Sequence, residues 1–327
     1  MPINDVLSIC IPTYNRAQLL RGCLENIIPQ AREHEIPIYI SDNASEDDTA
    51  GIVSAARRKY RHVYYSKNPS NLGADHNIAI VLKRSRSKYA WLFGDKYRLF
   101  PGAVDAVLGQ VPATECDLIV VNNSNTCYPD RRRDLRVKDI PGPSLYSDAN
   151  KLLGDLGWHM TMMSSLIFGS KIIEKGNYEK YRGTQFSHMG VIFDYLSDQI
   201  SSVLYISRPL FYNIRVPSGW IPRTFEIFAK KWFDLVNSLP ASYFDETKKK
   251  CIKDHGVKSG LFSFQNLLVL RGRGYFNYDI YKRYKFYFPY ITNVPQFILF
   301  LLSFMPVPAG FTGFLKKIRD FCNPRLK

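Results

Sequence analysis

Val6-Leu-Ser-Ile-Cys-Ile11, followed directly by Pro12-Thr-Tyr-Asn-Arg16, is a short apolar run that gives way to a polar loop. The run is typical of a buried β-strand, and we expect Pro12 to end it because proline has no N–H for a β-ladder. Apolar residues then recur at helical spacing, at Leu20, Cys23, Leu24 and Ile27. The stretch therefore predicts one strand–loop–helix unit.

The same unit repeats further along the chain. Strands are predicted at Ile36–Ile40, Val63–Tyr65 and Tyr89–Phe93. The first two lead through polar loops into helices, whose inner faces carry Ile52, Val53 and Ala56 in one case and Ile78, Val81 and Leu82 in the other. This alternation predicts an α/β fold with a Rossmann-like, mainly parallel sheet flanked by helices. Such a sheet binds its ligand beyond the carboxyl ends of its strands, where these polar loops lie.

Two changes of pattern divide the chain. From Asp117 the alternation loosens into a strand-like run at Leu118–Val121 and a charged loop at Asp130–Arg136. From about Trp220 the sequence becomes more helical, aromatic and basic. We therefore predict a first domain at residues 1–220, with a ligand-binding part at 1–115 and an acceptor part at 116–220. A helical C-terminal extension is predicted at 221–327.

Composition limits the class of protein. With 46% hydrophobic residues among 327, the chain can bury a large core, which argues against overall disorder. The 44 Lys and Arg against 29 Asp and Glu leave a formal net charge of +15, which favours phosphate groups, nucleic acid or anionic lipid as partners. The six cysteines form no C-x-x-C pair and no signal-peptide pattern is visible, so we expect a cytoplasmic protein.

Four segments place polar residues at the ends of the predicted strands. They are Leu7-Ser-Ile-Cys-Ile-Pro-Thr-Tyr-Asn-Arg16, Ile40-Ser-Asp-Asn-Ala-Ser45, Asn71-Leu-Gly-Ala-Asp75 and Trp91-Leu-Phe-Gly-Asp95. In order and spacing they resemble the family 2 inverting glycosyltransferases of the GT-A fold, especially bacterial enzymes that build O-antigen and related surface polysaccharides. The resemblance covers about the first third of the chain well and extends more loosely to about Trp220.

The resemblance implies that the first three segments bind a nucleotide-diphosphate-sugar donor. The residues implied are Pro12, Thr13, Tyr14, Asn15, Arg16, Asp42, Asn43, Ser45, Asn71, Gly73 and Asp75, with Asn77 completing the last motif. Asp42 in particular would accept a hydrogen bond from the N–H of a uracil-like ring, and Gly73 permits close backbone approach. Taken singly, each segment also fits ordinary turn and helix-entry chemistry.

The fourth segment departs from the family pattern. Relatives hold a divalent metal on the donor diphosphate with an acidic cluster, whereas this chain has Gly94, Asp95 and Lys96. One carboxylate beside an ammonium is a poor ligand set for Mg²⁺ or Mn²⁺, so Asp95 is a doubtful metal ligand and the divalent cation is a doubtful cofactor. Two interpretations stay open: the Lys96 ammonium takes the place of the metal's charge in catalysis, or the site is inactive.

Two later segments resemble the acceptor side of the same enzymes. Trp158-His-Met-Thr-Met-Met-Ser-Ser-Leu-Ile-Phe-Gly169 resembles the acceptor-pocket lining, which assigns Trp158, His159 and Ser164 to that side. Tyr181-Arg-Gly-Thr-Gln-Phe-Ser-His188 resembles the region before the catalytic base. His188 is therefore the candidate base, with Asp194 in reserve; a structural histidine under a helix is an equal alternative. Arg208, Arg215 and Trp220 fall in a stretch that closes over donor and acceptor in relatives.

The C-terminal tract combines an apolar run with basic residues. Phe297–Met305 is too short to cross a bilayer, which takes roughly 20 helical residues. The basic residues that follow are Lys316, Lys317, Arg319, Arg325 and Lys327. This combination favours an anionic membrane surface, and the alternative is a helix buried against the catalytic domain.

Together these features predict an inverting glycosyltransferase that moves a sugar from a nucleotide-diphosphate-sugar to a glycan acceptor, expected to be lipid-linked. We expect it at the inner face of the cell membrane, as a peripheral protein. The alternative is a catalytically inactive protein that binds a sugar nucleotide or a glycan on the same scaffold. No motif for nucleic-acid binding accompanies the basic charge, so nucleic acid is not an expected partner.

Overall fold

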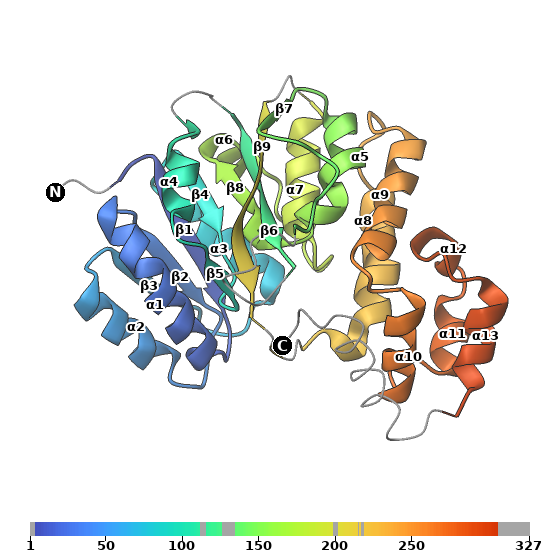
Figure 1. The fold of residues 1–327 in the computed structure, drawn as a ribbon. Coiled ribbons are helices and arrows are strands. Elements are labelled where there is room, and N and C mark those ends of the chain that lie inside the picture. Colours follow the sequence, from blue (N-terminus) through green and yellow to red (C-terminus); the bar gives the residue numbers. More distant parts are fainter. Residues whose placement is uncertain are drawn as a thin grey trace. The chain divides into compact units, whose positions relative to one another are not determined.

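The computed structural model describes residues 4–111, 116–125, 135–198, 202–214, 216 and 219–306. The chain divides into two compact units, whose elements are labelled in Figure 1. Met1–Val216 with Leu239–Tyr243 form the first unit, and Pro217–Ser238 with Phe244–Lys327 form the second.

The described part of the first unit is built on a nine-stranded mixed sheet. Its strands are β1 (Leu7–Thr13), β2 (Ile38–Asp42), β3 (Val63–Lys67), β4 (Tyr89–Leu92), β5 (Tyr97–Leu99), β6 (Leu118–Ser124), β7 (Ser144–Tyr146), β8 (Leu166–Gly169) and β9 (Val203–Asn213). Eight of them follow the order β3-β2-β1-β4-β8-β6-β9-β5, and β7 pairs with β9. The first four are mutually parallel, whereas β8 runs antiparallel between β4 and β6. The predicted α/β class is thereby confirmed.

Helices cover both faces of this sheet (Figure 1). One face carries α1 (Ala17–Glu33), α2 (Thr49–Lys59) and α4 (Ala103–Leu108). The other carries α3 (Ala74–Lys83), α5 (Ala149–Met160), α6 (Ser170–Lys175) and α7 (Ser187–Leu196). A short 3₁₀ turn, η2 (Met163–Ser165), precedes β8. Each of the first three helices follows directly on a parallel strand, as the sequence pattern predicts.

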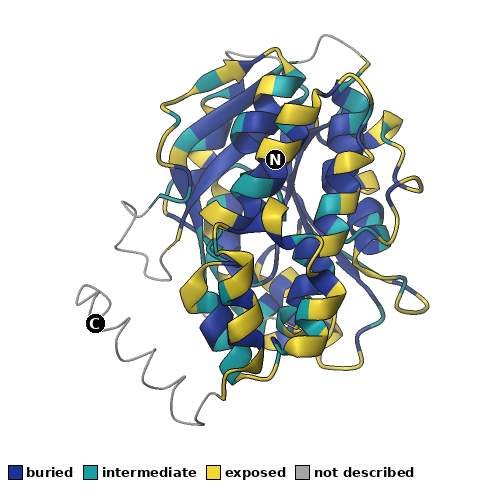
Figure 2. Ribbon diagram, turned by 90° about the vertical axis from the view of Figure 1, so that its right-hand side faces the viewer, coloured by how far each residue is buried: buried dark blue, intermediate teal, exposed yellow. Residues whose placement is uncertain are grey.

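Strand β1 shows how the two helical layers bury the sheet. Leu7, Ile9 and Ile11 belong to the core shared with α1 and α2. Ser8 and Cys10, which point to the opposite face, have no exposed surface either. Figure 2 accordingly shows the strands as buried and the outer faces of the helices as exposed. Burial on both faces explains why this strand is an almost continuous apolar run rather than an alternating one.

The prediction that Pro12 ends the first strand was wrong, because β1 continues through Pro12 to Thr13. Successive residues of β1 bond alternately to its two neighbours: the Ile9 N–H donates toward β2, and the Cys10 carbonyl accepts from the Phe93 N–H beyond β4. Pro12 is in phase with Cys10, and pairing with β4 ends at Cys10. The missing N–H of Pro12 therefore lies on the side of β1 where pairing with β4 has already ended. No hydrogen bond of the sheet is lost.

The second unit is helical in its described part. Its elements are η3 (Ile221–Arg223), a π-helical turn η4 (Phe225–Lys231), α8 (Trp232–Asn237), α9 (Asp245–Lys258), α10 (Phe264–Gly272), α11 (Tyr278–Tyr284), α12 (Phe288–Ile291) and α13 (Gln296–Phe304). Its core is aromatic: the Phe225 ring lies 5.3 Å from that of Phe276 and 6.1 Å from that of Phe288. In the part of the chain that the structure describes, none of the helices has the length and apolarity to span a bilayer.

Candidate functional site

The polar segments predicted to bind donor meet at one rim of the first unit. In the parallel ladder Thr13 pairs with Asp42, so the ends of β1 and β2 lie side by side. Strand β4 ends at Leu92 on the other side of β1, and its following turn carries Gly94 and Asp95. Because parallel strands finish at the same edge, residues 80 positions apart in sequence converge there.

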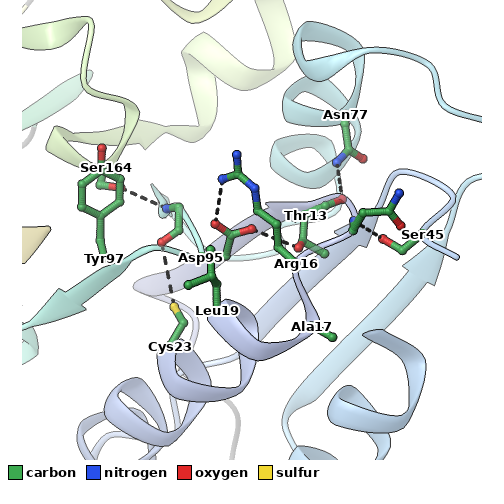
Figure 3. A network of polar contacts seen from close by, with 12 residues as sticks. Thr13, Arg16, Ala17, Leu19, Cys23, Ser45, Asn77, Asp95, Tyr97 and Ser164 are labelled. Atoms are coloured by element: carbon green, nitrogen blue, oxygen red, sulfur yellow. Dashed lines mark hydrogen bonds and ion pairs between the residues drawn. The ribbon is translucent and has the colours of Figure 1, made fainter. Parts of the chain in front are cut away.

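Asp95 is the centre of a buried polar network at this rim (Figure 3). Its Oδ2 accepts a hydrogen bond from the Thr13 hydroxyl at 3.1 Å, and its Oδ1 lies 3.3 Å from a guanidinium nitrogen of Arg16. The Asp95 side chain is 5% exposed, whereas that of Arg16 is 41% exposed. The carboxylate is thus fixed beneath the surface while the guanidinium remains open to solvent.

Burial and charge act in opposite directions on the Asp95 carboxyl. Desolvation raises its pKa, and Arg16, Thr13 and Lys96 lower it, but burial dominates. The neighbouring Lys96 has a lowered pKa, first because burial disfavours its ammonium and then because of Arg16, while Asp95 acts the other way. The Lys96 ammonium lies 5.3 Å from the centre of the Tyr97 ring. Two cations therefore flank one carboxylate.

The turn that presents Asp95 is held by a segment that was predicted to lie on the acceptor side. The Ser164 hydroxyl accepts a hydrogen bond from the Gly94 N–H at 3.0 Å, and the Ser164 carbonyl accepts one from the Trp91 indole at 2.9 Å. A side chain at position 94 would meet ring carbons of Tyr97 at 3.0 Å, which explains the glycine. Ser164, predicted on the acceptor side, thus positions the donor-side turn.

Asp42 is buried and fully engaged in the structure. Its Oδ1 accepts from the Ser45 N–H at 2.8 Å, and its Oδ2 accepts from the Tyr65 hydroxyl at 2.6 Å. Lys67 donates to the Ser45 carbonyl at 2.6 Å and so fastens the same loop. The sequence reasoning missed Tyr65 and Lys67; their signal was the polar continuation of the third strand, which places them beside Asp42 in the ladder.

Amides tie the second and third loops together. Asn43 donates to Asn71 at 2.7 Å and accepts from the Leu72 N–H at 2.9 Å. Asn77 accepts from the Ser41 hydroxyl at 2.6 Å and donates to the Ser41 carbonyl at 3.0 Å. Gly73 precedes α3 with φ of 84°, a conformation that favours glycine. The loops around Asp42 are thus pre-shaped by their own side chains.

The loop after β1 is anchored through Asn15 to the loop after β2, whereas Tyr14 is left exposed. The Asn15 N–H donates to the Ser45 hydroxyl at 2.8 Å, and the Asn15 side chain accepts from the Glu46 N–H at 2.8 Å. Tyr14 differs in that its side chain is exposed. This leaves an aromatic ring at the rim beside Arg16, as the donor-binding prediction requires.

Asp75 points away from the donor loops and toward α7. Its two oxygens accept the N–H groups of Gln185 at 3.0 Å and Ser187 at 3.3 Å, which are the free donors at the start of that helix. Asp75 is 5% exposed. It therefore acts as an N-terminal cap supplied from α3, which places a carboxylate next to His188.

His188 occupies a buried position on the first turn of α7. Within the described ranges, no group meets hydrogen-bond geometry with either of its ring nitrogens, and the residue is 3% exposed. Burial lowers its pKa to about 4, against the opposing influence of Asp75 and of the Met160 and Thr161 backbone. His188 is consequently neutral near pH 7, with an imidazole nitrogen free to accept a proton. Its assignment as the catalytic base stays a prediction, and a structural histidine under the helix stays the alternative, because the Met160 and Thr161 backbone groups also interact with the ring.

Two other candidate titrating groups have hydrogen-bond partners, although the Nδ1 of His159 has none among the described residues. Asp194, on the last turn of α7, accepts hydrogen bonds from the Tyr181 hydroxyl at 2.9 Å and from Lys180. His159 is buried, with one ring nitrogen 2.9 Å from the Val121 carbonyl, and burial lowers its pKa to about 3. His159 is therefore neutral near pH 7, and its assignment to the acceptor side stays a prediction.

Arg136 was not singled out by the sequence reasoning, although it ends the charged loop. Its guanidinium carbon lies 4.9 Å from the centre of the Trp158 ring, and its Nε has no hydrogen-bond partner among the described residues. Burial lowers its pKa to about 10, so it remains charged at neutral pH. It also acts on the Tyr97 hydroxyl, whose pKa burial raises to about 12. Arg136 is thus a third cation near the turn of Asp95.

Three predicted residues cannot be placed at this rim. Arg215 lies outside the described residues, as do the basic residues Lys316 to Lys327. Trp220 belongs to the second unit, where its ring lies 5.0 Å from that of Phe228. Arg208 is an exposed residue of β9. Their assignment to the closing of the site stays a prediction.

The comparison with known protein families identifies the class of protein to which this rim belongs. Residues 8–168 match the family model described as "Glycosyl transferase family 2". The matched segment includes β1 to β6, the Asp95 turn, Trp158 and Ser164. Residues 8–168 therefore form a glycosyl transferase family 2 domain.

Three known proteins illustrate its likeness to this class. The abequosyltransferase RfbV of Salmonella typhimurium is 28% identical over 227 residues, which span 63% of this chain and 65% of that relative. The GalNAc(5)-diNAcBac-PP-undecaprenol beta-1,3-glucosyltransferase of Campylobacter jejuni is 22% identical over 92% of this chain and 94% of its own length. The mannosyltransferase PcManGT of Pyrobaculum calidifontis, solved with GDP-Man and Mn²⁺, shares the fold with a TM-score of 0.51 at 13% identity, over 93% of this chain and 86% of its own. The fold is the GT-A fold of these transferases.

Proposed function

We propose that this protein transfers a sugar from a nucleotide-diphosphate-sugar to a glycan acceptor in bacterial polysaccharide synthesis, with inversion at the anomeric carbon. The observation that carries the proposal is the convergence of Arg16, Asp42 and Asp95 at one rim of a parallel sheet. Buried carboxylates and amides there could recognise a base and ribose, and the cations beside Asp95 could hold a diphosphate. The relatives named above are glycosyltransferases by their names, and PcManGT was solved with the nucleotide sugar GDP-Man.

The reaction needs one base and one stabilised leaving group. An acceptor hydroxyl oxygen forms the new bond to the anomeric carbon, its proton passes to the His188 imidazole, and the bond to the donor diphosphate breaks. The electron pair of that bond leaves on the nucleoside diphosphate, so atoms and charge balance. His188 is preferred to Asp194 because its ring nitrogens are unpaired, whereas Asp194 is already hydrogen bonded. The Asp75 carboxylate would stabilise the imidazolium that forms.

A lipid-linked acceptor and attachment to the inner face of the cell membrane form the second part of the proposal. Helix α13 presents Phe297, Phe300, Leu301 and Phe304 with 66%, 42%, 57% and 52% exposure. Their spacing puts them on one side of the helix, while Leu299 and Leu302 face the unit's core. Helix α11, which contacts α13, carries the exposed Lys282 and Arg283. Apolar anchors beside cations suit an anionic leaflet.

The test of the transferase proposal is a two-stage assay on the full chain. A thermal-shift panel of UDP-, GDP-, CDP- and TDP-sugars first identifies the donor, because a ligand that binds only the folded state raises the melting temperature. Transfer from that donor to lipid-linked saccharides extracted from bacterial membranes is then measured. Donor binding and transfer together support the proposal. Binding without transfer or donor hydrolysis favours the inactive sugar-nucleotide-binding alternative, and no binding to any donor overturns both.

A further inference from the structure

The charges around Asp95 differ in sign from those of a metal site. Arg16 lies 3.3 Å from the Asp95 carboxylate, and Lys96 follows it directly in the same turn. Arg16, Lys96 and the Asp95 carboxylate leave one positive charge in excess, and Arg136 adds a further cation near the same turn. A site that relies on a divalent metal has the reverse balance, since its carboxylates must attract the cation before a diphosphate can bind. This rim therefore attracts an anion without a divalent metal.

The oxygens that a divalent metal would need are also in use. One oxygen of Asp95 accepts from the Thr13 hydroxyl, and the other contacts Arg16. Over the described ranges, the His, Cys, Asp and Glu side chains gather three ligand atoms within 4.8 Å only at Glu33, His34 and Asp105, a group that does not include Asp95. Mg²⁺ and Mn²⁺ prefer several oxygen ligands, so the residues present do not fit a metal held in the family manner.

The two cations are arranged as a binding pair rather than as a structural ion pair. The Arg16 side chain is 41% exposed and can present a second guanidinium edge to a ligand while it contacts Asp95. The Lys96 ammonium makes no hydrogen bond within the described part of the chain, and it lies over the Tyr97 ring. A half-buried ammonium with free donors is costly to keep unless an acceptor joins it.

We propose that Arg16 and Lys96 bind the diphosphate of the donor directly and replace the divalent cation in this enzyme. The inference rests on the proposed function and concerns how the same site works. As the bond from the anomeric carbon to the diphosphate oxygen breaks, the electron pair remains on that oxygen, and the two cations stabilise the added charge. Thr13 and Asp95 then have a positioning role, because they hold Arg16 at the rim.

The first experiment compares nucleotide binding with and without metal. Calorimetric titration of the full chain with UDP, GDP, CDP and TDP is run in EDTA and again in Mn²⁺. We expect the nucleotide that binds to do so in EDTA, with a Kd within about threefold of that in Mn²⁺. Saturable binding in Mn²⁺ that EDTA abolishes overturns the inference but leaves the transferase proposal standing. Failure of all four nucleotides in both buffers overturns the inference together with the proposal.

A set of variants tests whether Lys96 is responsible for nucleotide binding in the absence of metal. Lys96→Met should weaken the Kd in EDTA by about ten- to a hundredfold, the range expected for losing one charge-assisted contact. Lys83→Met is the matched control, because it removes the same charge at the far end of α3, and it should bind as the wild type does. Lys96→Asp should bind only when Mn²⁺ is present. Wild-type affinity of folded Lys96→Met, checked by its melting curve, would contradict the inference.

Discussion

At the scale of single residues, His188 and Asp194 are the two candidates for the proton acceptor. His188 is buried, and neither ring nitrogen is paired with another residue that the structure describes, whereas Asp194 is hydrogen bonded to Tyr181 and Lys180. A polar group buried without partners costs stability, so its retention is more easily explained by a role in the reaction. The low pKa of His188 keeps it neutral over the working range of the enzyme.

We predict that His188→Gln lowers kcat by about a hundredfold or more while the Kd for the nucleotide stays within about threefold, because general-base catalysis contributes that much to a rate. The matched variant Asp194→Asn should keep kcat within a few-fold of wild type. Single-turnover transfer and calorimetric binding are the measurements. Full activity of His188→Gln with loss in Asp194→Asn would reverse the assignment.

The dependence of kcat on pH also tests the role of His188. Because burial lowers the pKa of His188 to about 4, the base is already deprotonated above pH 5. We therefore expect no rise in kcat between pH 6 and pH 8 that titrates with a pKa near the ordinary histidine value. A kcat that increases tenfold per unit across that interval would exclude this buried imidazole.

At the scale of elements, one carboxylate joins α3 to α7. Asp75 caps the start of α7 and approaches His188, so the donor-side helix fixes the helix that carries the candidate base. Asp75→Asn keeps a capping oxygen but removes the charge. We expect a loss of about 1 kcal/mol in unfolding free energy and a lower kcat, with nucleotide affinity unchanged. A weakened nucleotide Kd with unaltered kcat would instead make Asp75 a donor ligand.

A second prediction at the scale of elements concerns the binding of helix α13 to membranes. Replacing its exposed Phe297 and Leu301 by Ser should reduce cosedimentation with vesicles of phosphatidylglycerol at least fivefold, because two apolar anchors are lost. The control is Val257→Ser, which removes an exposed apolar side chain from α9. Unchanged recovery of the double variant, or equal recovery of the wild type on neutral vesicles, would refute the membrane proposal.

At the scale of the whole molecule, buried histidines make stability depend on pH. The pKa values of His159 and His188 are lowered to about 3 and about 4 in the folded state, so the unfolded chain takes up protons first as the pH falls below about 6.5. Their contribution to stability is complete above that pH and is lost toward the folded pKa. The raised pKa of Asp95 acts in the opposite direction over part of this range.

We therefore predict that the free energy of unfolding falls between pH 7 and pH 5, by about 1.4 kcal/mol per unit for each histidine at most, measured by urea denaturation. A His159→Gln, His188→Gln double variant should show a flatter curve. A wild-type stability that rises on acidification in this interval would show that the carboxyl groups dominate instead.

The sequence by itself determined the α/β class, the order of the first four strands and the first three helices, and the polar residues at the ends of those strands. It could do so because apolar runs, helical spacing and polar loops are local patterns. The predicted ends of the first three strands at Ile11, Ile40 and Tyr65 were each two residues short. Their true ends, Thr13, Asp42 and Lys67, are polar residues carried into the ladder by backbone pairing, which does not depend on side-chain polarity.

Only the tertiary structure decided which polar residues act on one another. The pairing of Arg16 with Asp95, the stacking of Arg136 on Trp158 and the capping of α7 by Asp75 each join segments distant in sequence. Whether a carboxylate is a ligand, a cap or a counter-ion depends on what burial places beside it, since desolvation and neighbouring charge set its energy. Local sequence does not show which residues become neighbours after folding. The roles of these side chains could therefore be assigned only from the tertiary structure.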